Sequence, residues 1–451
     1  MAETIRTKAE PAKGELRRQL GLGSAAALIV AEVIAVGIFL TPAEMTKLLG
    51  SPAWLAAVWL VMGAMALSGA LCYGELASRF PEAGGGYVYL REAYGPQVAF
   101  LYGWKSLLIM DPGITAALAI GLASYAGYII DLSPLATKAL AFASILILAT
   151  ANIFGARLGA LLIKSIAILK LGLLAAITIW AFAFGLGDWS NFLPIAAQRP
   201  GSAPLMQALA GGMVAAFFSF GGWWDLSKLA GEVRDPRRSL PRALALGVIA
   251  VTLIYMLISA VFIYLIPIER VTSGETFAAQ AGEALFGRTG GAIFSAVVIV
   301  SVLGSLEAVI MSAPRVYYAM ARDRLFFHSI ASLHPRFGTP VRAIVLQAAL
   351  ASLLVMLGTF NQIIAYFIFV TVIFIALTVA AVFVLRRKDP AAVAYRAPGY
   401  PITPVVFLLL IAVLLFLLAA NNPKQAFSGV GVVIAGAVVY RLAFRKARPE
   451  I

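Results

Sequence analysis

Long apolar stretches separated by short polar segments run through almost the whole of this chain. A helix needs about 20 apolar residues to cross roughly 30 Å of hydrocarbon, and most of these stretches reach or approach that length. They predict membrane spans at residues 20–40, 54–77, 98–130, 135–154, 160–184, 208–241, 243–266, 292–320, 343–358, 362–385, 402–420 and 429–444. The predicted fold class is therefore an all-α integral membrane protein with twelve transmembrane helices.

The sixth stretch, residues 208–241, is interrupted at mid-depth. Ser219, Gly221 and Gly222 break the apolar pattern, and Asp225 begins a second helical segment. An interrupted helix leaves N–H and C=O groups without intrahelical partners, and a bilayer tolerates these only where protein, a cavity or a bound solute satisfies them. A broken span therefore predicts a solute-binding site.

The first stretch carries a comparable break. The segment 35–39 (AVGIF) lies near its middle and is followed by Thr41 and Pro42. Five spans separate this break from the one in the sixth stretch, which fits two inverted five-helix units around a site at the membrane midplane. The expected organisation is a tail at 1–19, a first repeat at 20–185, a second at 205–386, two further helices at 402–444 and a tail at 445–451.

Composition and charge support the membrane interpretation. Of 451 residues, 61% are hydrophobic and only 12% are charged, whereas soluble domains carry roughly 25% charged residues. The net charge of +14 does not indicate nucleic-acid binding, because the basic residues gather in the tails and in the loops after the even-numbered spans. The opposite side receives few: Lys47, Lys138, Arg199, Arg270, Arg288 and Lys424. This asymmetry predicts a multi-pass protein of the inner (plasma) membrane with both termini in the cytoplasm.

Nothing in the sequence predicts a cofactor or a metal ion. The single Cys72 excludes an internal disulfide. His328 and His334 have no further ligands at a spacing typical of zinc sites, so we expect them to be surface residues of a loop. A phosphate-binding GxxxxGK[ST] loop is also absent, which argues against a directly energised pump.

Five long motifs are spread along the chain: GIFLTP (37–42), YGELASRFPEAGGGYVYLREAYGP (73–96), FLYGW (100–104), FGGWWDLSKLAGEVRDPRRSLPRAL (220–244) and APRVYYAMARDRLF (313–326). Together they resemble the amino acid–polyamine–organocation (APC) superfamily of transporters, closest to its L-type amino acid transporter branch. The resemblance covers spans one to ten. It implies the five-plus-five inverted repeat with broken helices 1 and 6, and transport by alternating access.

An α-amino acid zwitterion needs donors for its carboxylate and acceptors for its ammonium group. Exposed N–H groups around Val36, Gly37 and Ile38 suit the carboxylate, and the carbonyls of Phe218, Ser219 and Gly221 suit the ammonium group. Many relatives carry Gly-Ser where this chain has Ala35-Val36, so carboxylate binding would depend on backbone donors alone. The alternative is that the glycines only permit close helix packing.

The resemblance also assigns side chains to the substrate. It implies that Phe218 acts as a gate, that Ile109 and Met110 line the side-chain pocket, and that Trp224 reshapes it, since relatives often carry Asn there. The predicted substrate-binding residues are Ala35, Val36, Gly37, Ile38, Ile109, Met110, Phe218, Ser219, Phe220, Gly221 and Trp224.

Lys170 lies in the middle of the fifth span, where an unpaired ammonium group is energetically costly. By resemblance it takes the place of a sodium ion in sodium-coupled relatives and braces span one against span eight through the hydroxyl of Ser305 or Ser301. Transport is then expected to be independent of sodium. Glu307 is an alternative partner for Lys170.

Four acidic residues, Glu32, Asp111, Asp225 and Glu307, lie within apolar stretches. Asp225 is either the N-cap of the second half-helix or a partner of Lys228, which precedes Glu232 by four residues; Glu32 could join Lys228. Internal pairing is the preferred interpretation. A coupling proton or a cationic substrate side chain is the alternative.

These features predict a secondary amino acid transporter, sodium-independent and working by exchange or coupled to protons. Small or branched neutral amino acids are the expected substrates, and cationic amino acids or polyamines the alternative. The sequence lacks both the continuous polar stripe of a channel and the clustered catalytic groups of an enzyme, so neither class is expected. The expected partners are the amino acid and the lipid bilayer, and no oligomeric state is predicted.

Overall fold

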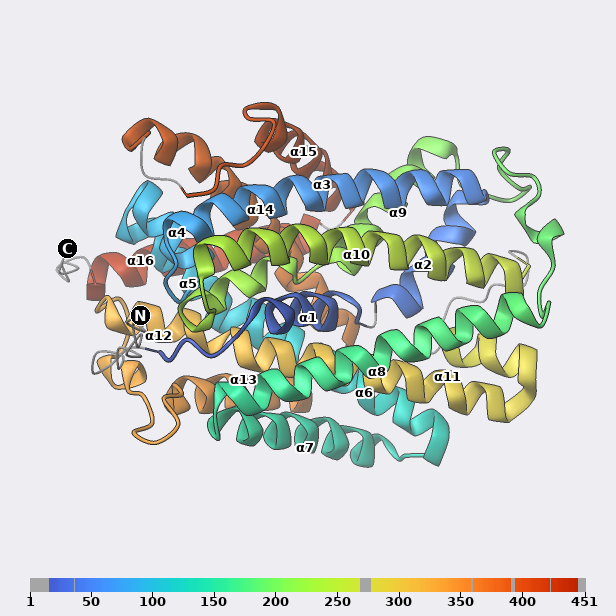
Figure 1. Cartoon of the computed structure of the whole chain (residues 1–451), viewed down its shortest axis with the longest axis horizontal. Coiled ribbons are helices and arrows are strands. Elements are labelled where there is room, and N and C mark those ends of the chain that lie inside the picture. The colour runs from blue at the N-terminus through green and yellow to red at the C-terminus, as the bar shows by residue number, and fades with distance from the viewer. Residues whose placement is uncertain are drawn as a thin grey trace, which may run out of the picture.

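The computed structural model describes residues 16–35, 37–267, 277–357, 360–390, 394–421 and 423–444. Within these residues the chain is helical, and extended pairing is confined to one isolated bridge between Leu20 and Val233. Most long helices run along the long axis of the molecule, and the described part of the chain begins and ends at the same end of the bundle (Figure 1). The predicted all-α class is confirmed.

Nine of the described helical segments are long and apolar enough to cross a membrane: Pro52–Arg79, Pro96–Ile130, Pro134–Ile153, Ala156–Ala183, Leu205–Glu232, Pro236–Leu265, Phe286–Arg322, Phe369–Lys388 and Ile402–Ala420. Three shorter apolar helices are Leu22–Val33, Val341–Leu357 and Gly429–Phe444. Each corresponds in position to one of the predicted stretches. The full count of twelve spans stays a prediction.

The first part of the chain contains α1 (Leu22–Val33), α2 (Gly37–Leu49), α3 (Pro52–Arg79), α4 (Gly86–Tyr94), α5 (Pro96–Lys105), η1 (Ser106–Met110), α6 (Asp111–Ile130), α7 (Pro134–Ile153) and α8 (Ala156–Ala183). Proline at the first positions of several of these helices fits a site where no N–H donor is needed. Ser51 and Ser133 cap α3 and α7 through their side chains. The third span is irregular, because η1 is a π-helical turn between α5 and α6.

The second part contains η2 (Trp189–Phe192), α9 (Leu205–Phe220), η3 (Trp223–Glu232), α10 (Pro236–Leu265), α11 (Phe277–Ser312), α12 (Pro314–Arg322), η5 (His328–Ala331), α13 (Val341–Leu357), α14 (Phe360–Lys388), α15 (Ile402–Asn421), α16 (Pro423–Val439) and η6 (Tyr440–Phe444). The last of these is again π-helical. Non-helical backbone at Phe286 and Gly287 divides α11 into two segments.

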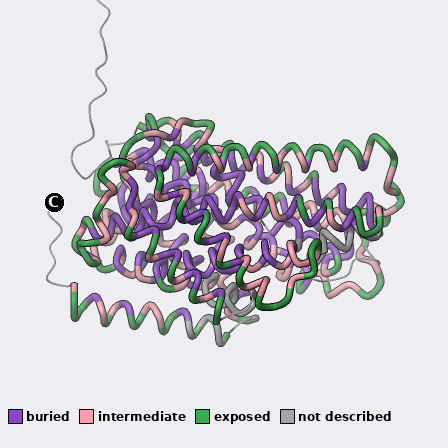
Figure 2. The backbone as a smooth tube through the Cα atoms, turned by 90° about the horizontal axis from the view of Figure 1, so that it is seen from below, coloured by how far each residue is buried: buried purple, intermediate pink, exposed green. Residues whose placement is uncertain are grey.

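Packing brings the two parts of the chain together. The helix α2 packs against α9, α3 lies along α10, and α11 contacts both α6 and α8. Buried positions follow the middle of the bundle, and exposed positions concentrate on the outer helices (Figure 2). Many of these exposed side chains are large and apolar, such as Leu161, Ile168 and Ile179 on α8. An outer surface of this kind suits hydrocarbon rather than water.

Candidate functional site

Both predicted helix breaks are present. The helix α1 ends at Val33 and α2 begins at Gly37, and the described residues between them, Ile34 and Ala35, are not helical. The helix α9 ends at Phe220, and Gly221 and Gly222 separate it from η3. The two interruptions bring non-helical backbone from both halves of the chain into the interior.

The segment after the second break differs from the prediction. Residues Trp223–Glu232 form a 3₁₀-helix rather than an α-helical half-span, and Gly222 occupies the N-cap position without a side-chain cap. Asp225 therefore does not serve as the N-cap, because it lies inside the first turn of η3. Gly222 has φ 108°, a conformation that favours glycine, and an added Cβ would come within 2.8 Å of Glu32 Cγ.

Hydrogen bonds and close packing join the two breaks. A Cβ on Gly37 would lie 2.9 Å from the Cα of Ser219, so only glycine allows this approach of α2 to α9. The hydroxyl groups of Thr41 and Ser219 are 2.5 Å apart, and Thr41 also donates to the Gly37 carbonyl at 2.8 Å. The hydroxyl of Tyr255 on α10 contacts the carbonyl oxygens of Val33 at 2.6 Å and of Ser219 at 2.7 Å.

A cavity of about 60 Å³ lies between the breaks. Its lining includes seven predicted substrate-binding residues, namely Ala35, Gly37, Met110, Phe218, Ser219, Gly221 and Trp224, and two predicted acidic residues, Glu32 and Asp225. It also includes Val33, Ile114, Ala117, Leu118, Phe217, Gly222, Val309 and Thr371, which the sequence did not indicate. A largely apolar lining with a few polar groups is typical of small-molecule sites.

Four predicted substrate-binding residues are not part of this lining. Val36 lies outside the described residues. Ile38 is fully buried, Ile109 is half-buried on η1, and Phe220 packs against the rings of Trp59 and Tyr255. Phe220 therefore packs against neighbouring rings and does not line the cavity.

The carbonyl groups predicted to be free are partly occupied. The Phe218 carbonyl accepts from the N–H of Gly221 at 3.1 Å, and the Ser219 carbonyl accepts from Tyr255. Each carbonyl oxygen has two lone pairs, so both retain capacity for a ligand.

Lys170 caps the broken end of α1. Its ammonium group donates to the carbonyl oxygen of Ala31 at 2.9 Å and to that of Ile34, and its side chain is fully buried. Ser305 on α11 donates to the same Ala31 carbonyl at 2.5 Å. The brace between spans one and eight thus runs through a shared carbonyl, and the predicted contact of Lys170 with a serine hydroxyl is wrong. The Ser301 hydroxyl has no hydrogen-bond partner among the described residues.

Glu307 does not pair with Lys170. One of its carboxyl oxygens accepts from the amide of Asn152 on α7 at 2.9 Å, and the residue is fully buried. The alternative pairing with Lys170 is therefore wrong, because Lys170 is directed toward the end of α1.

The ammonium group of Lys228 forms ion pairs with the carboxylates of Asp225, at 2.9 Å, and Asp111, at 3.0 Å. The hydroxyl of Tyr317 also donates to Asp111, at 3.0 Å. Three residues complete one turn of a 3₁₀-helix, so Asp225 and Lys228 lie directly above each other on η3. The same geometry moves Glu232 away from Lys228. Glu232 pairs instead with Arg315 at 2.6 Å, and the predicted continuation of the ladder to Glu232 is wrong.

Glu32 does not join Lys228 as the sequence suggested. Neither of its carboxyl oxygens has a hydrogen-bond partner among the described residues, and only 4% of the residue is exposed. The carboxyl of Asp225 faces it within hydrogen-bonding reach. Two acidic side chains from the two broken spans therefore meet at the cavity wall.

Comparison with known proteins identifies the family. A family model for amino acid permeases matches residues 20–444. The chain belongs to the amino acid permease family. The predicted resemblance to the APC superfamily is confirmed, and the permease is a membrane-embedded, multi-pass protein of a family of transporters.

Three relatives place the permease more narrowly. It is 32% identical over 440 residues to the serine/threonine exchanger SteT of Bacillus subtilis, and the aligned region covers 96% of this chain and 98% of that protein. It is 28% identical over 419 residues to the human b(0,+)-type amino acid transporter 1, covering 90% of this chain and 84% of the relative. The mouse Asc-type amino acid transporter 1 is 26% identical over 453 residues, and the aligned region covers 96% of this chain and 83% of the relative.

Several polar residues of the permease interior were not predicted. They include Tyr255 beside the breaks, Arg315 and Tyr317, which bind Glu232 and Asp111, and Lys105 at the end of α5. The Lys105 ammonium group lies 2.9 Å from the sulfur of Met110 and 4.6 Å from the ring centre of Tyr102. A basic residue within an apolar stretch is itself a signal, and it could have drawn attention to Lys105.

We expect Tyr255→Phe to weaken substrate binding while the permease still folds. The substitution removes the side-chain hydroxyl that, among the described residues, contacts carbonyls of both breaks, at a cost of about 1–3 kcal/mol for the buried hydrogen bonding that is lost. The Michaelis constant for uptake into proteoliposomes should rise accordingly. Tyr264→Phe on the same helix is the matched control, since its hydroxyl forms none of the described hydrogen bonds that hold the site. Equal Michaelis constants for the two variants would refute a joining role of Tyr255.

Proposed function

We propose that this permease is an alternating-access secondary transporter of small neutral amino acids, independent of sodium and driven by exchange or by protons. The observation that carries the proposal is the cavity between the two breaks. Gly37 lies at the N-terminus of α2, where free N–H groups can donate to a substrate carboxylate, and the carbonyls of Phe218, Ser219 and Gly221 on the opposite break can accept from its ammonium group. A single site thus offers donors for the carboxylate and acceptors for the ammonium group of an amino acid.

The remaining lining favours a short side chain. Met110, Ile114 and Phe218 are apolar, and Ser219 and Thr371 add hydroxyl groups. Such a mixture suits alanine, serine or threonine better than a long polar side chain. The similarity to a protein named as a serine/threonine exchanger supports the same choice.

Sodium independence is supported by the position of Lys170. Backbone carbonyl oxygens are the groups with which channels and transporters coordinate alkali cations. Here the Ala31 and Ile34 carbonyls already accept hydrogen bonds from an ammonium group, so the charge of a sodium ion is supplied by the protein itself.

The packing of the helices supports the inverted repeat at 20–185 and 205–386. Contacts join α2 with α9, α3 with α10 and α6 with α11. In terms of spans, the first span thus meets the sixth, the second meets the seventh and the third meets the eighth. Equivalent helices of two inverted units meet in this way around a central pseudo-two-fold axis. Helices 402–444 lie outside the repeats.

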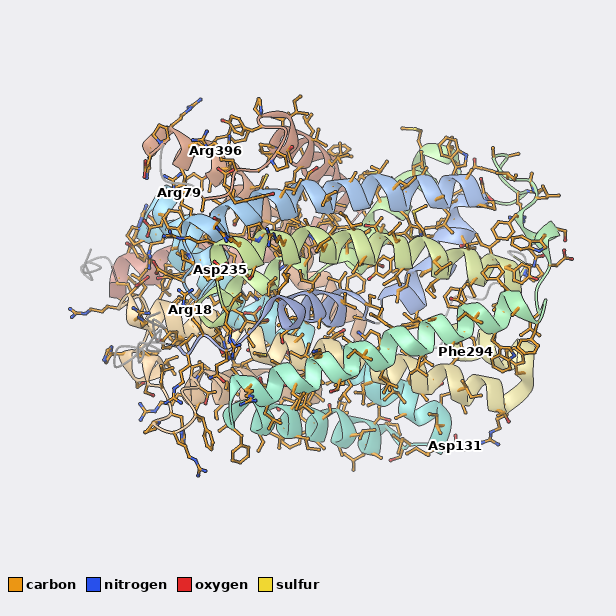
Figure 3. All side chains as sticks on the ribbon, in the orientation of Figure 1. Arg18, Arg79, Asp131, Asp235, Phe294 and Arg396 are labelled. Carbon is orange, nitrogen blue, oxygen red and sulfur yellow. The ribbon has the colours of Figure 1, made fainter. Side chains whose placement is uncertain are left out.

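The distribution of charge supports cytoplasmic termini. Arg18, Arg79 and Arg396 lie at one end of the bundle, and Asp131 lies at the other (Figure 3). The described chain also begins and ends at the arginine-rich end (Figure 1). By the positive-inside rule this end faces the cytoplasm of a plasma-membrane protein.

Counterflow in proteoliposomes tests the proposal. Vesicles loaded with unlabelled serine should accumulate external radiolabelled serine transiently, and equally in sodium and in choline medium. Alanine and threonine should compete, whereas leucine and phenylalanine should compete less. No counterflow with any neutral amino acid would refute the function, and counterflow only in sodium would refute the role of Lys170.

A further inference from the structure

The buried carboxyl of Glu32 forms no ion pair with the described residues, and Lys228, the cation that acts on it, is already shared by two other carboxylates. It lines the cavity from the last turn of α1, it is 4% exposed, and neither oxygen accepts a hydrogen bond from the part of the chain that the structure describes. A carboxylate in such surroundings would lose its hydration without compensation. The residue therefore requires a proton or a cation when the cavity is dry.

The groups around Glu32 come from several elements and are already engaged. On η3, Asp225 faces it, and Lys228 is shared between Asp225 and Asp111 of α6. The other nearby cation, Lys105 of α5, points to the Met110 sulfur and the Tyr102 ring. Tyr317 of α12 donates to Asp111. Among the described residues of this cluster, three carboxyls meet two ammonium groups, and Glu32 is the carboxyl that forms no direct ion pair.

We propose that Glu32 and Asp225 share one exchangeable proton, and that this proton travels with the amino acid. With the proton present, the Glu32 O–H donates to the Asp225 carboxylate, and both carboxyls are satisfied. No covalent bond changes: the proton comes from water on one side of the membrane and returns to water on the other. The proposal rests on the proposed function and makes the transporter a proton symporter.

The placement of the two carboxyls explains how transport would move the proton. Glu32 belongs to α1, which precedes the first break, and Asp225 belongs to η3, which follows the second break. These two half-spans lie on the same side of the cavity. Alternating access changes how such half-spans pack against the rest of the bundle. When α1 and η3 separate, the shared hydrogen bond is lost, and the proton can leave for water.

The test measures accumulation driven by a pH gradient in proteoliposomes, with the membrane potential clamped near zero by potassium and valinomycin. One proton per amino acid corresponds to about tenfold accumulation of serine for each pH unit, acidic outside. The wild type should approach this value. Glu32→Gln should show no accumulation above equilibration, because the amide keeps the shape of the side chain and cannot carry the proton.

Asp131→Asn is the matched control, because Asp131 is exposed at the far end of α6 and has φ 44°, a conformation that asparagine also accepts. It should accumulate serine as the wild type does. If Glu32→Gln does not fold, a pH-sensitive dye inside wild-type vesicles provides the second measurement. Serine uptake without an imposed gradient should acidify the lumen.

The outcomes separate this inference from the proposed function. Counterflow without any effect of the pH gradient on the wild type, or undiminished accumulation by Glu32→Gln, would overturn the proton site and leave amino acid transport intact. Loss of wild-type counterflow would overturn the proposed function itself. If lysine or ornithine displaces serine from the wild type but not from Glu32→Gln, the pair holds a cationic side chain, and the proton role is wrong.

Discussion

Lys228→Met is expected to destabilise the permease by about 3–5 kcal/mol, because it leaves two buried carboxylates without their shared cation. The ammonium group lies 2.9 Å from Asp225 and 3.0 Å from Asp111, and the side chains of all three are buried. Methionine fills a similar volume, so the effect measures the loss of charge rather than a cavity. The free energy of unfolding in mixed detergent micelles is the appropriate measurement.

Two further variants show whether the charge is the cause. Lys164→Met removes an exposed lysine of α8 and should change the free energy of unfolding by less than about 0.5 kcal/mol. Combining Lys228→Met with Asp111→Asn removes one of the orphaned charges and should recover part of the lost stability. If the double variant is no more stable than Lys228→Met alone, the ion-pair explanation does not hold.

Gly37→Ala is expected to reduce the rate of transport by about 100-fold or more, since displacements of about 1 Å at a site can cost that much. The new Cβ would lie 2.9 Å from the Cα of Ser219, and the backbone of α9 cannot rotate away as a side chain could. The methyl group would push apart the two breaks at the point where the cavity forms. Initial rates of serine counterflow measure the effect.

Gly172→Ala provides the control for the glycine substitution. Gly172 is a helical glycine of α8, and an added Cβ there meets no atom within 4 Å. Alanine should leave transport unchanged and should stabilise the helix by roughly 0.5–1 kcal/mol. A Gly37→Ala permease that transports at the wild-type rate would show that close contact between the breaks is not required.

The helix breaks could be predicted because their cause is local. Gly221 and Gly222 interrupt an apolar run in the printed sequence, and Gly37 does the same in the first stretch. Several residues near these glycines then line the cavity, as Ala35, Phe218 and Ser219 do, although Ile38 and Phe220 do not. Neighbours along the chain are carried to the site together, so the pattern was sufficient for them.

The partners of the charged residues were predicted less well. Asp225 and Lys228 are close in sequence, and their pairing was among the predicted alternatives. The partners Asn152 of Glu307 and Arg315 of Glu232 come from distant helices, and no spacing indicates them. The 3₁₀ form of η3 also escaped prediction, because helix type in a half-span depends on how its ends are held.

The sequence by itself determined that this chain is a helical membrane protein, where two of its helices are interrupted, and to which family it belongs. These properties follow from local hydrophobicity, glycine and long motifs, all of which are contiguous in the chain. Only the tertiary structure decided which charge meets which. An ion pair depends on the distance between atoms on different helices, and that distance exists only after the bundle has packed.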